Sequence, residues 1–428
     1  MHKSIVAGFF FFFCLNITLA QHLQKDSYIV LKPEQVFDGI DIHSGWMVLV
    51  HNNIIEYSGP SNSVTVPENS TKIDLPHCTL LPGLIEGHSH LFLHPYNETS
   101  WNDQVLLESR VERTARAIDH AKKTLMAGFT TVRDLGTEGA GYDDVGLKQT
   151  IEKNIIPGPR MIVATTAIVA TGSYGPKVLT FDQTSIKGAA EADGTDALIK
   201  EIRNEIGKGA DVIKLYADYY WGPGRKAMTT FTTNELKTAV EVANSAGRDV
   251  VVHASTAEGM RRSILAGVST IEHGNEGTSE LFKMMKDKGI AWCPTLSADQ
   301  AIAEYRGWKK GVDPEPESIK MKRNTFSLAL TSGVIICMGG DVGVYSHGDN
   351  AREMEAMVDY GMKPLDVLRS STSVNASIFK MGNKIGKIQK GLLADLIAVE
   401  GDPSKNISDI RKTKLVMKDG IVYRQEKL

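Results

Sequence analysis

The sequence predicts an α/β fold: a distorted (β/α)8 barrel of the TIM type, with a small β-sandwich domain built from both chain ends. Between residues 79 and 382, short apolar runs alternate with amphipathic segments, which is the pattern of strands and helices in a parallel sheet. The flanks, residues 21–78 and 383–428, instead show short strands separated by turn residues. Neither flank is long enough to bury a core alone, so we expect the two to form one domain together.

Eight apolar runs are the predicted barrel strands. They cover residues 79–85, 130–134, 160–164, 212–215, 249–253, 269–272, 290–294 and 334–338. Amphipathic stretches between them predict helices, for example at residues 105–126, 198–208, 235–246 and 280–288. Eight such units in about 300 residues favour a closed barrel over an open sheet.

The first twenty residues differ from the rest of the chain. A basic residue, Lys3, precedes an apolar segment with five consecutive phenylalanines, and the small residues Thr18 and Ala20 follow. This pattern predicts a secretory signal peptide over residues 1–20 and a secreted or periplasmic protein. A membrane anchor would need about twenty apolar residues, and this run is shorter.

The charge balance gives no reason to expect nucleic acid or a membrane surface as a partner. The formal net charge is −3, and removing the signal peptide takes away one basic residue, Lys3, which leaves −4. The expected partner is a small-molecule substrate. The sequence is also compatible with a homo-oligomer. Cys78, Cys293 and Cys337 would remain, and three cysteines cannot form a fully paired disulfide framework.

Ionisable residues recur where the predicted strands end. Gly87-His88-Ser89-His90 directly follows the first strand, and alternate residues of a strand point to one face, so both imidazoles can aim at one point. Four further ionisable residues lie at the ends of later strands: Lys214, His253, His273 and Asp341. The C-terminal ends of barrel strands converge on the active site, so we expect these side chains to meet there.

The chemistry of this set favours a metal site. Four imidazoles and one carboxylate suit borderline divalent ions such as Zn²⁺. For Lys214 two interpretations stay open. The lysine either extends along the surface to solvent, or desolvation and nearby cations favour its neutral amine. A neutral amine can take up CO2 to form a carbamate, whose two oxygens could bridge two metal ions.

Four segments resemble the amidohydrolase superfamily, within the imidazolonepropionase-like and prolidase-like (Xaa-Pro dipeptidase) group that includes ochratoxin-hydrolysing amidases. They are LPGLIEGHSH at 81–90, IEHG at 271–274, GDVG at 340–343 and GKIQKGLLADL at 386–396. The resemblance covers essentially the whole chain after residue 20. Lys214 falls where the binuclear members of the superfamily carry a carboxylated lysine.

The resemblance implies a site with two divalent ions and a bridging hydroxide as the nucleophile. It implies these ligands: His88, His90 and Asp341 on the more buried ion, His253 and His273 on the second, and carboxylated Lys214 between them. Cations lower the pKa of bound water, so such a hydroxide would be nucleophilic near neutral pH. Asp341 would be the general base, passing the proton on to the leaving amine.

The predicted substrate contacts are Tyr174 and His347. Many prolidase-like members place a histidine in a T-G-G-H segment after the third strand, and this chain has Tyr174 at that point. Ser255 stands where several members have a tyrosine, so the dipeptide specificity of those members cannot be assigned to this chain. Tyr174 either donates a hydrogen bond to the substrate or packs in the loop, and His347 lies in a loop after the eighth strand.

The first functional hypothesis is a binuclear metal-dependent hydrolase that cleaves an amide or peptide bond to an amino acid, in a dipeptide, an Xaa-Pro dipeptide or an N-acyl amino acid. The alternative is a cyclic amidase or deaminase of the imidazolonepropionase type with one metal ion. The bridging lysine argues against it, as does the absence of a glutamate in residues 253–256, where deaminases carry one. A non-catalytic binding protein would have lost metal ligands, and all six positions are filled.

Overall fold

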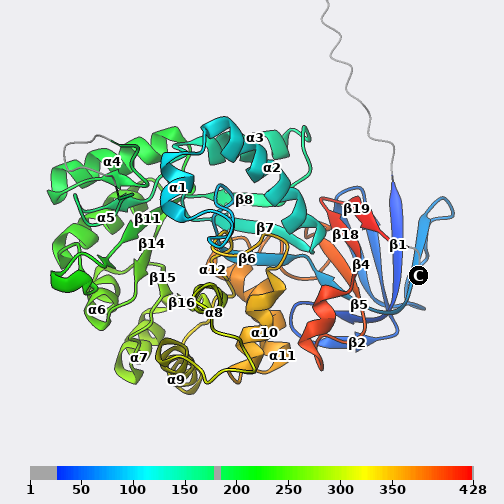
Figure 1. Cartoon of the computed structure of the whole chain (residues 1–428). Coiled ribbons are helices and arrows are strands. Elements are labelled where there is room, and N and C mark those ends of the chain that lie inside the picture. The colour runs from blue at the N-terminus through cyan, green and yellow to red at the C-terminus, as the bar shows by residue number, and fades with distance from the viewer. Residues whose placement is uncertain (1–26, 178–184, 427–428) are drawn as a thin grey trace, which may run out of the picture.

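The computed structural model describes residues 27–177 and 185–426. Helices and parallel strands fill one side of the molecule, and a sheet lies against them on the other (Figure 1). The signal peptide predicted over residues 1–20 lies outside the described residues. In the described part of the chain, no helix has the length and apolar character needed to cross a membrane.

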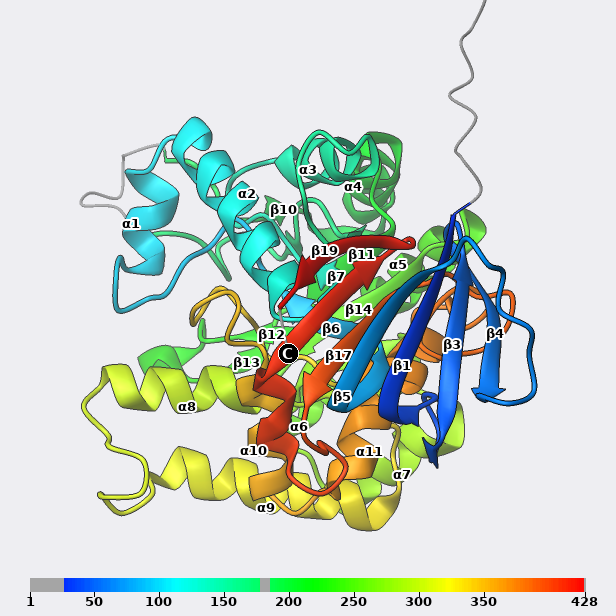
Figure 2. The same cartoon turned by 90° about the vertical axis from the view of Figure 1, so that its right-hand side faces the viewer.

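Both ends of the chain meet in one eight-stranded sheet. Its order is β19–β18–β17–β5–β1–β3–β4, with β2 paired to β1. The strands are β1 (Tyr28–Phe37), β2 (Ile42–Ser44), β3 (Trp46–His51), β4 (Ile54–Pro60), β5 (Thr71–Pro82), β17 (Leu396–Glu400), β18 (Thr413–Lys418) and β19 (Ile421–Gln425). Figure 2 shows the C-terminal strands, in red and orange, beside the N-terminal ones in blue. All eight strands belong to one hydrogen-bonded sheet, so the expected sandwich of two sheets is not confirmed.

The parallel strands fall into two further sheets. One contains β6 (Leu84–Ser89), β7 (Phe129–Asp134) and β8 (Arg160–Val163). The other has the order β10 (Ala190–Glu191), β9 (Ile168–Val169), β11 (Val212–Tyr216), β14 (Asp249–Ala254), β15 (Thr270–His273) and β16 (Ala291–Cys293). A two-stranded sheet of β12 (Asp218–Tyr219) and β13 (Met228–Thr229) lies beyond the end of β11.

The first predicted strand is really the junction of two strands. Residues 79–82 end β5 in the eight-stranded sheet, and β6 begins at Leu84. Gly83 separates them because a side chain there would collide with Thr130, whose Oγ1 would be 2.1 Å from a Cβ. The next six predicted runs coincide with β7, β8, β11, β14, β15 and β16.

The eighth predicted strand forms isolated bridges instead of a ladder. Ile336 bridges Trp292 of β16, and Val342 bridges Ser89 of β6, so the segment lies between the first and seventh parallel strands. Gly340 gives its N–H to the carboxylate of Glu86, and Asp341 has a left-handed φ of 61°, which interrupts an extended backbone. The structure therefore shows a mixed α/β fold without a continuous closed barrel sheet.

Helices cover the parallel strands on the outside (Figure 1). They are α1 (Trp101–Leu106), α2 (Arg110–Met126), α3 (Asp143–Glu152), α4 (Gly194–Lys208), α5 (Thr233–Ser245), α6 (Ala257–Ala266), α7 (Ser279–Lys288), α8 (Leu296–Tyr305), α9 (Glu317–Ser332), α10 (Ala351–Asp359), α11 (Pro364–Arg369) and α12 (Asn375–Ile378). The helix expected at 105–126 is two helices, because Ser109 caps the N-terminus of α2 by accepting from Glu112 N–H. The helices expected at 198–208, 235–246 and 280–288 correspond to α4, α5 and α7.

Candidate active site

A cavity of about 190 Å³ opens where the parallel strands end. It is lined by the four predicted histidines and the predicted carboxylate: His88, His90, His253, His273 and Asp341. They come from the end of β6, the ends of β14 and β15, and the irregular segment after residue 338. The structure thus brings together five of the six residues predicted to bind metal.

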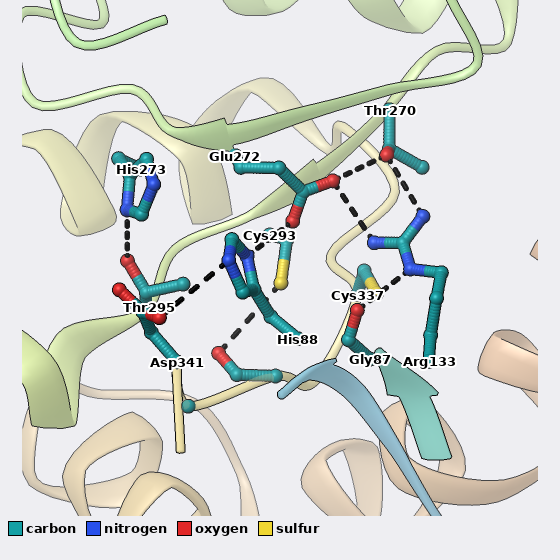
Figure 3. Close-up of polar contacts among 12 residues, drawn as sticks. Gly87, His88, Arg133, Thr270, Glu272, His273, Cys293, Thr295, Cys337 and Asp341 are labelled. Atoms are coloured by element: carbon teal, nitrogen blue, oxygen red, sulfur yellow. Dashed lines mark hydrogen bonds and ion pairs between the residues drawn. The ribbon is translucent and has the colours of Figure 1, made fainter. Parts of the chain in front are cut away.

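His88 is held between two carboxylates, as Figure 3 shows. Its Nδ1 lies 2.8 Å from Glu272 Oε2, and Glu272 in turn forms a buried ion pair of 2.9 Å with Arg133. A carboxylate paired to an arginine can only accept, so His88 Nδ1 carries the proton. Burial lowers the pKa of His88 to about 4, which keeps the imidazole neutral. Its Nε2 is buried without a hydrogen-bond partner, 3.6 Å from Asp341 Oδ1, and so keeps a lone pair on the cavity side.

His90 is oriented in the same way by a backbone oxygen. Its Nδ1 donates to the carbonyl of Gly136 at 2.9 Å, and its Nε2 lies 3.3 Å from Asp341 Oδ1. Burial lowers the pKa of His90, but the contact with Asp341 outweighs it and raises the pKa to about 9. The negative charge that stabilises a proton at this nitrogen would also attract a metal cation.

His253 and His273 stand side by side, with ring centroids 4.4 Å apart. His273 Nδ1 is 2.8 Å from the hydroxyl of Thr295. His253 stacks on Tyr216 at 4.7 Å, and its Nε2 lies 3.7 Å from Asp218. Burial, followed by the charge of the nearby Lys214, lowers the pKa of His253 to about 3, so this ring is also neutral.

Lys214 is buried under the cavity, with only 1% of its surface exposed. The alternative that this lysine reaches solvent is therefore wrong. Burial lowers the pKa of Lys214, and Arg133 adds to that effect while Glu272 and Asp341 oppose it. Among the described residues its Nζ has no hydrogen-bond or ion-pair partner, and the ring of Tyr216 lies 5.5 Å from it. A buried amine without an acceptor loses much of the stabilisation that its charge would need.

The two predicted substrate contacts lie in different places. Tyr174 lines the cavity, and its hydroxyl donates to the carboxylate of Glu138. His347 does not line this cavity: its Nε2–H donates to the carbonyl of Leu93 at 3.0 Å, and its ring stacks on His120 at 4.2 Å. His347 thus packs against Leu93 and His120 outside this cavity, and its predicted contact with the substrate stays a prediction.

Comparison with known proteins agrees with this geometry. The family model described as "Amidohydrolase family" matches residues 79–422. The chain belongs to the amidohydrolase family. Ochratoxinase from Aspergillus niger is 26% identical over 367 residues, which cover 79% of this chain and 73% of that protein.

Solved structures of related enzymes have the same fold as this amidohydrolase. A Xaa-Pro dipeptidase with bound methionine is 30% identical, with a TM-score of 0.81 over 93% of this chain and 100% of that one. A prolidase complexed with N-methylphosphonate-L-proline is 26% identical, with a TM-score of 0.80 over 94% and 100%. The protein is thus a hydrolase of amide or peptide bonds, of a family that depends on metal ions, with an α/β fold of the TIM-barrel type.

Several residues that surround this set were not predicted from the sequence. Glu272 and Arg133 interrupt apolar strands with opposite charges, and that signal could have predicted their buried pair. Thr295, which contacts His273, and Glu138, which contacts Tyr174, lie in irregular segments with no periodic pattern. Only the fold shows that these two residues reach the site.

Proposed function

We propose that this amidohydrolase uses two divalent metal ions, zinc by the chemistry of the ligands, to cleave an amide or peptide bond to an amino acid. The proposed ligands are His88, His90, His253, His273, Asp341 and a carboxylated Lys214. The observation that supports this most is the buried Nε2 of His88, which lacks a partner beside the other candidate ligands. Atoms of His88, His273 and Asp341 lie within 4.8 Å of one another, so they could share one ion.

We infer the substrate class from the related enzymes. A Xaa-Pro dipeptidase and a prolidase are among the similar structures, and ochratoxinase is among the similar sequences. We therefore propose a dipeptide, an Xaa-Pro dipeptide or an N-acyl amino acid as the substrate. A screen of these compounds with metal-loaded protein tests the proposal, and no hydrolysis of any of them would contradict it.

Bound divalent ions would supply a water of lowered pKa and would polarise the scissile carbonyl. Asp341 is the proposed proton carrier. Burial alone would raise the pKa of Asp341, but His88 and His90 outweigh it and hold that pKa well below the usual range. Asp341 is thus a carboxylate at neutral pH, able to take the proton of the attacking water and deliver it to the leaving amine.

Metal content is the first expected result. Purified protein should hold close to two divalent ions per chain, measured by elemental analysis, and chelation should abolish hydrolysis until metal is restored. Full activity with one ion per chain would contradict the two-metal site. It would favour the imidazolonepropionase-like alternative instead.

Replacing Glu272 with glutamine should weaken metal binding by about 10- to 100-fold, because a neutral amide has one acceptor oxygen and cannot serve both His88 and Arg133 as the carboxylate does. The variant should also be destabilised by about 3–5 kcal/mol, since Arg133 keeps its charge in the interior without an anionic partner. A chelator competition measures the first effect, and denaturant unfolding the second. Glu353→Gln is the control, because this buried carboxylate accepts from the backbone N–H groups of residues 296 and 297 and forms no hydrogen bond with a proposed metal ligand. Equal metal affinity in wild type and Glu272→Gln would refute the orienting role.

A further inference from the structure

Glu138 is a buried carboxylate in the wall of the candidate active site. It follows β7, lines the cavity and is 2% exposed. Its backbone has a left-handed φ of 51°, and Arg113 fixes this loop by donating to the carbonyls of Thr137 and Glu138 at 2.9 and 2.7 Å. The loop therefore presents the carboxylate in one defined position.

The hydrogen-bond partners of Glu138 are all neutral. Trp101 Nε1 donates to Oε2 at 3.0 Å, the hydroxyl of Tyr174 donates to the same oxygen, and the hydroxyl of Tyr216 lies 3.3 Å from Oε1. Within the described ranges, 27–177 and 185–426, no cationic side chain forms an ion pair with this carboxylate. The guanidinium of Arg113 is nearby but is used on backbone carbonyls.

Apart from the four histidines, the ionisable groups in the described cavity wall are carboxylates and tyrosines. Asp299, the other lining carboxylate besides Asp341, already has a cation: Lys322 lies 3.4 Å away and is fully buried. Of the described residues that line the cavity, none is a lysine or an arginine. A substrate therefore meets one carboxylate, Glu138, whose charge has no cationic side chain bound to it.

We infer that Glu138 binds a protonated amine of the substrate, so that the enzyme prefers dipeptides with a free amino terminus over N-acyl amino acids. The inference rests on the proposed function and narrows its substrate class. A buried charge is costly unless it is paired. An ammonium group would supply the missing pair and can donate up to three hydrogen bonds. An acylated amine carries no charge, so it leaves Glu138 uncompensated.

The test compares one dipeptide with the same dipeptide acetylated on its amino group. Wild type should have the higher kcat/KM for the free amine. Glu138→Gln should lower kcat/KM for the free amine by about 10- to 100-fold and change that for the acetylated form much less, since a charged hydrogen bond is lost in one case only. The glutamine oxygen can still accept from Trp101 and Tyr174, and its amide can donate to Tyr216, so the wall keeps its shape.

Two further variants separate charge from packing. Glu138→Asp keeps the charge and should retain the preference for the free amine, even if both rates fall. Asp299→Asn removes a carboxylate that Lys322 already compensates, so it should affect both substrates alike. Equal losses on both substrates in Glu138→Gln would overturn the inference and make Glu138 a support for Tyr174.

Binding measurements keep the inference separate from the proposed function. Calorimetry with metal-loaded protein gives the affinity for the free and acetylated dipeptides. If wild type hydrolyses neither but binds the free amine more tightly, and Glu138→Gln does not, the proposed reaction fails and the inference stands. If wild type shows no preference in binding or in hydrolysis, the inference is wrong whatever the reaction is.

Discussion

Replacing Asp341 with asparagine should lower kcat for an amide substrate by about 10²–10⁴-fold, the usual contribution of general acid–base catalysis. The carboxylate is proposed to act twice in each turnover, as a base on water and as an acid to the leaving amine. Asparagine keeps the shape and one oxygen but is a very poor proton acceptor. Metal content should fall less than kcat, because the proposed histidines and Lys214 would still hold the ions.

An ester with an activated phenolate leaving group separates the two roles of Asp341. Phenolate needs no proton to leave, so the loss in kcat should be smaller on the ester than on the amide. It should not vanish, because attack still needs the base. Equal losses on both substrates with metal intact would remove Asp341 from the acid step. Loss of both metals in Asp341→Asn would show only that the residue is a ligand.

Replacing Lys214 with alanine should abolish metal binding and activity, with a loss larger than the roughly 100-fold typical of residues that merely support a ligand. The reason is the proposed carbamate, which would supply one oxygen to each ion. Short carboxylic acids should partly restore activity to Lys214→Ala, because they offer the same two oxygens. Elemental analysis and hydrolysis assays with added acid measure both effects.

Two comparisons decide whether Lys214 acts through a carbamate. Lys214→Arg keeps the positive charge but cannot react with CO2, so it should be as inactive as the alanine variant. Lys322→Ala is the matched control: this lysine is also buried, but it donates to the carbonyl of His273 and to Asn275. Carboxylic acids should not rescue it. Activity close to wild type in Lys214→Arg would rule the carbamate out.

The sequence by itself determined the order of the strands and most of the residues at their ends. The alternation of apolar runs and amphipathic segments predicted six parallel strands at their observed places, since strand and helix periodicities are local properties of the chain. It also predicted that ionisable residues at 88, 90, 253, 273 and 341 would meet, and they line one cavity. The signal peptide and the roles of the ligands stay predictions.

The tertiary structure decided what depends on contacts between distant segments. The eighth run forms an isolated bridge with β16 instead of a ladder, and just after it the N–H of Gly340 bonds to the side chain of Glu86 from the first parallel strand. His347 packs on His120, and Lys214 is buried in the interior, which the sequence pattern left open. Glu138 reaches the cavity from an irregular loop. Hydrogen bonding and burial across the fold set these environments, and neither is encoded in local periodicity.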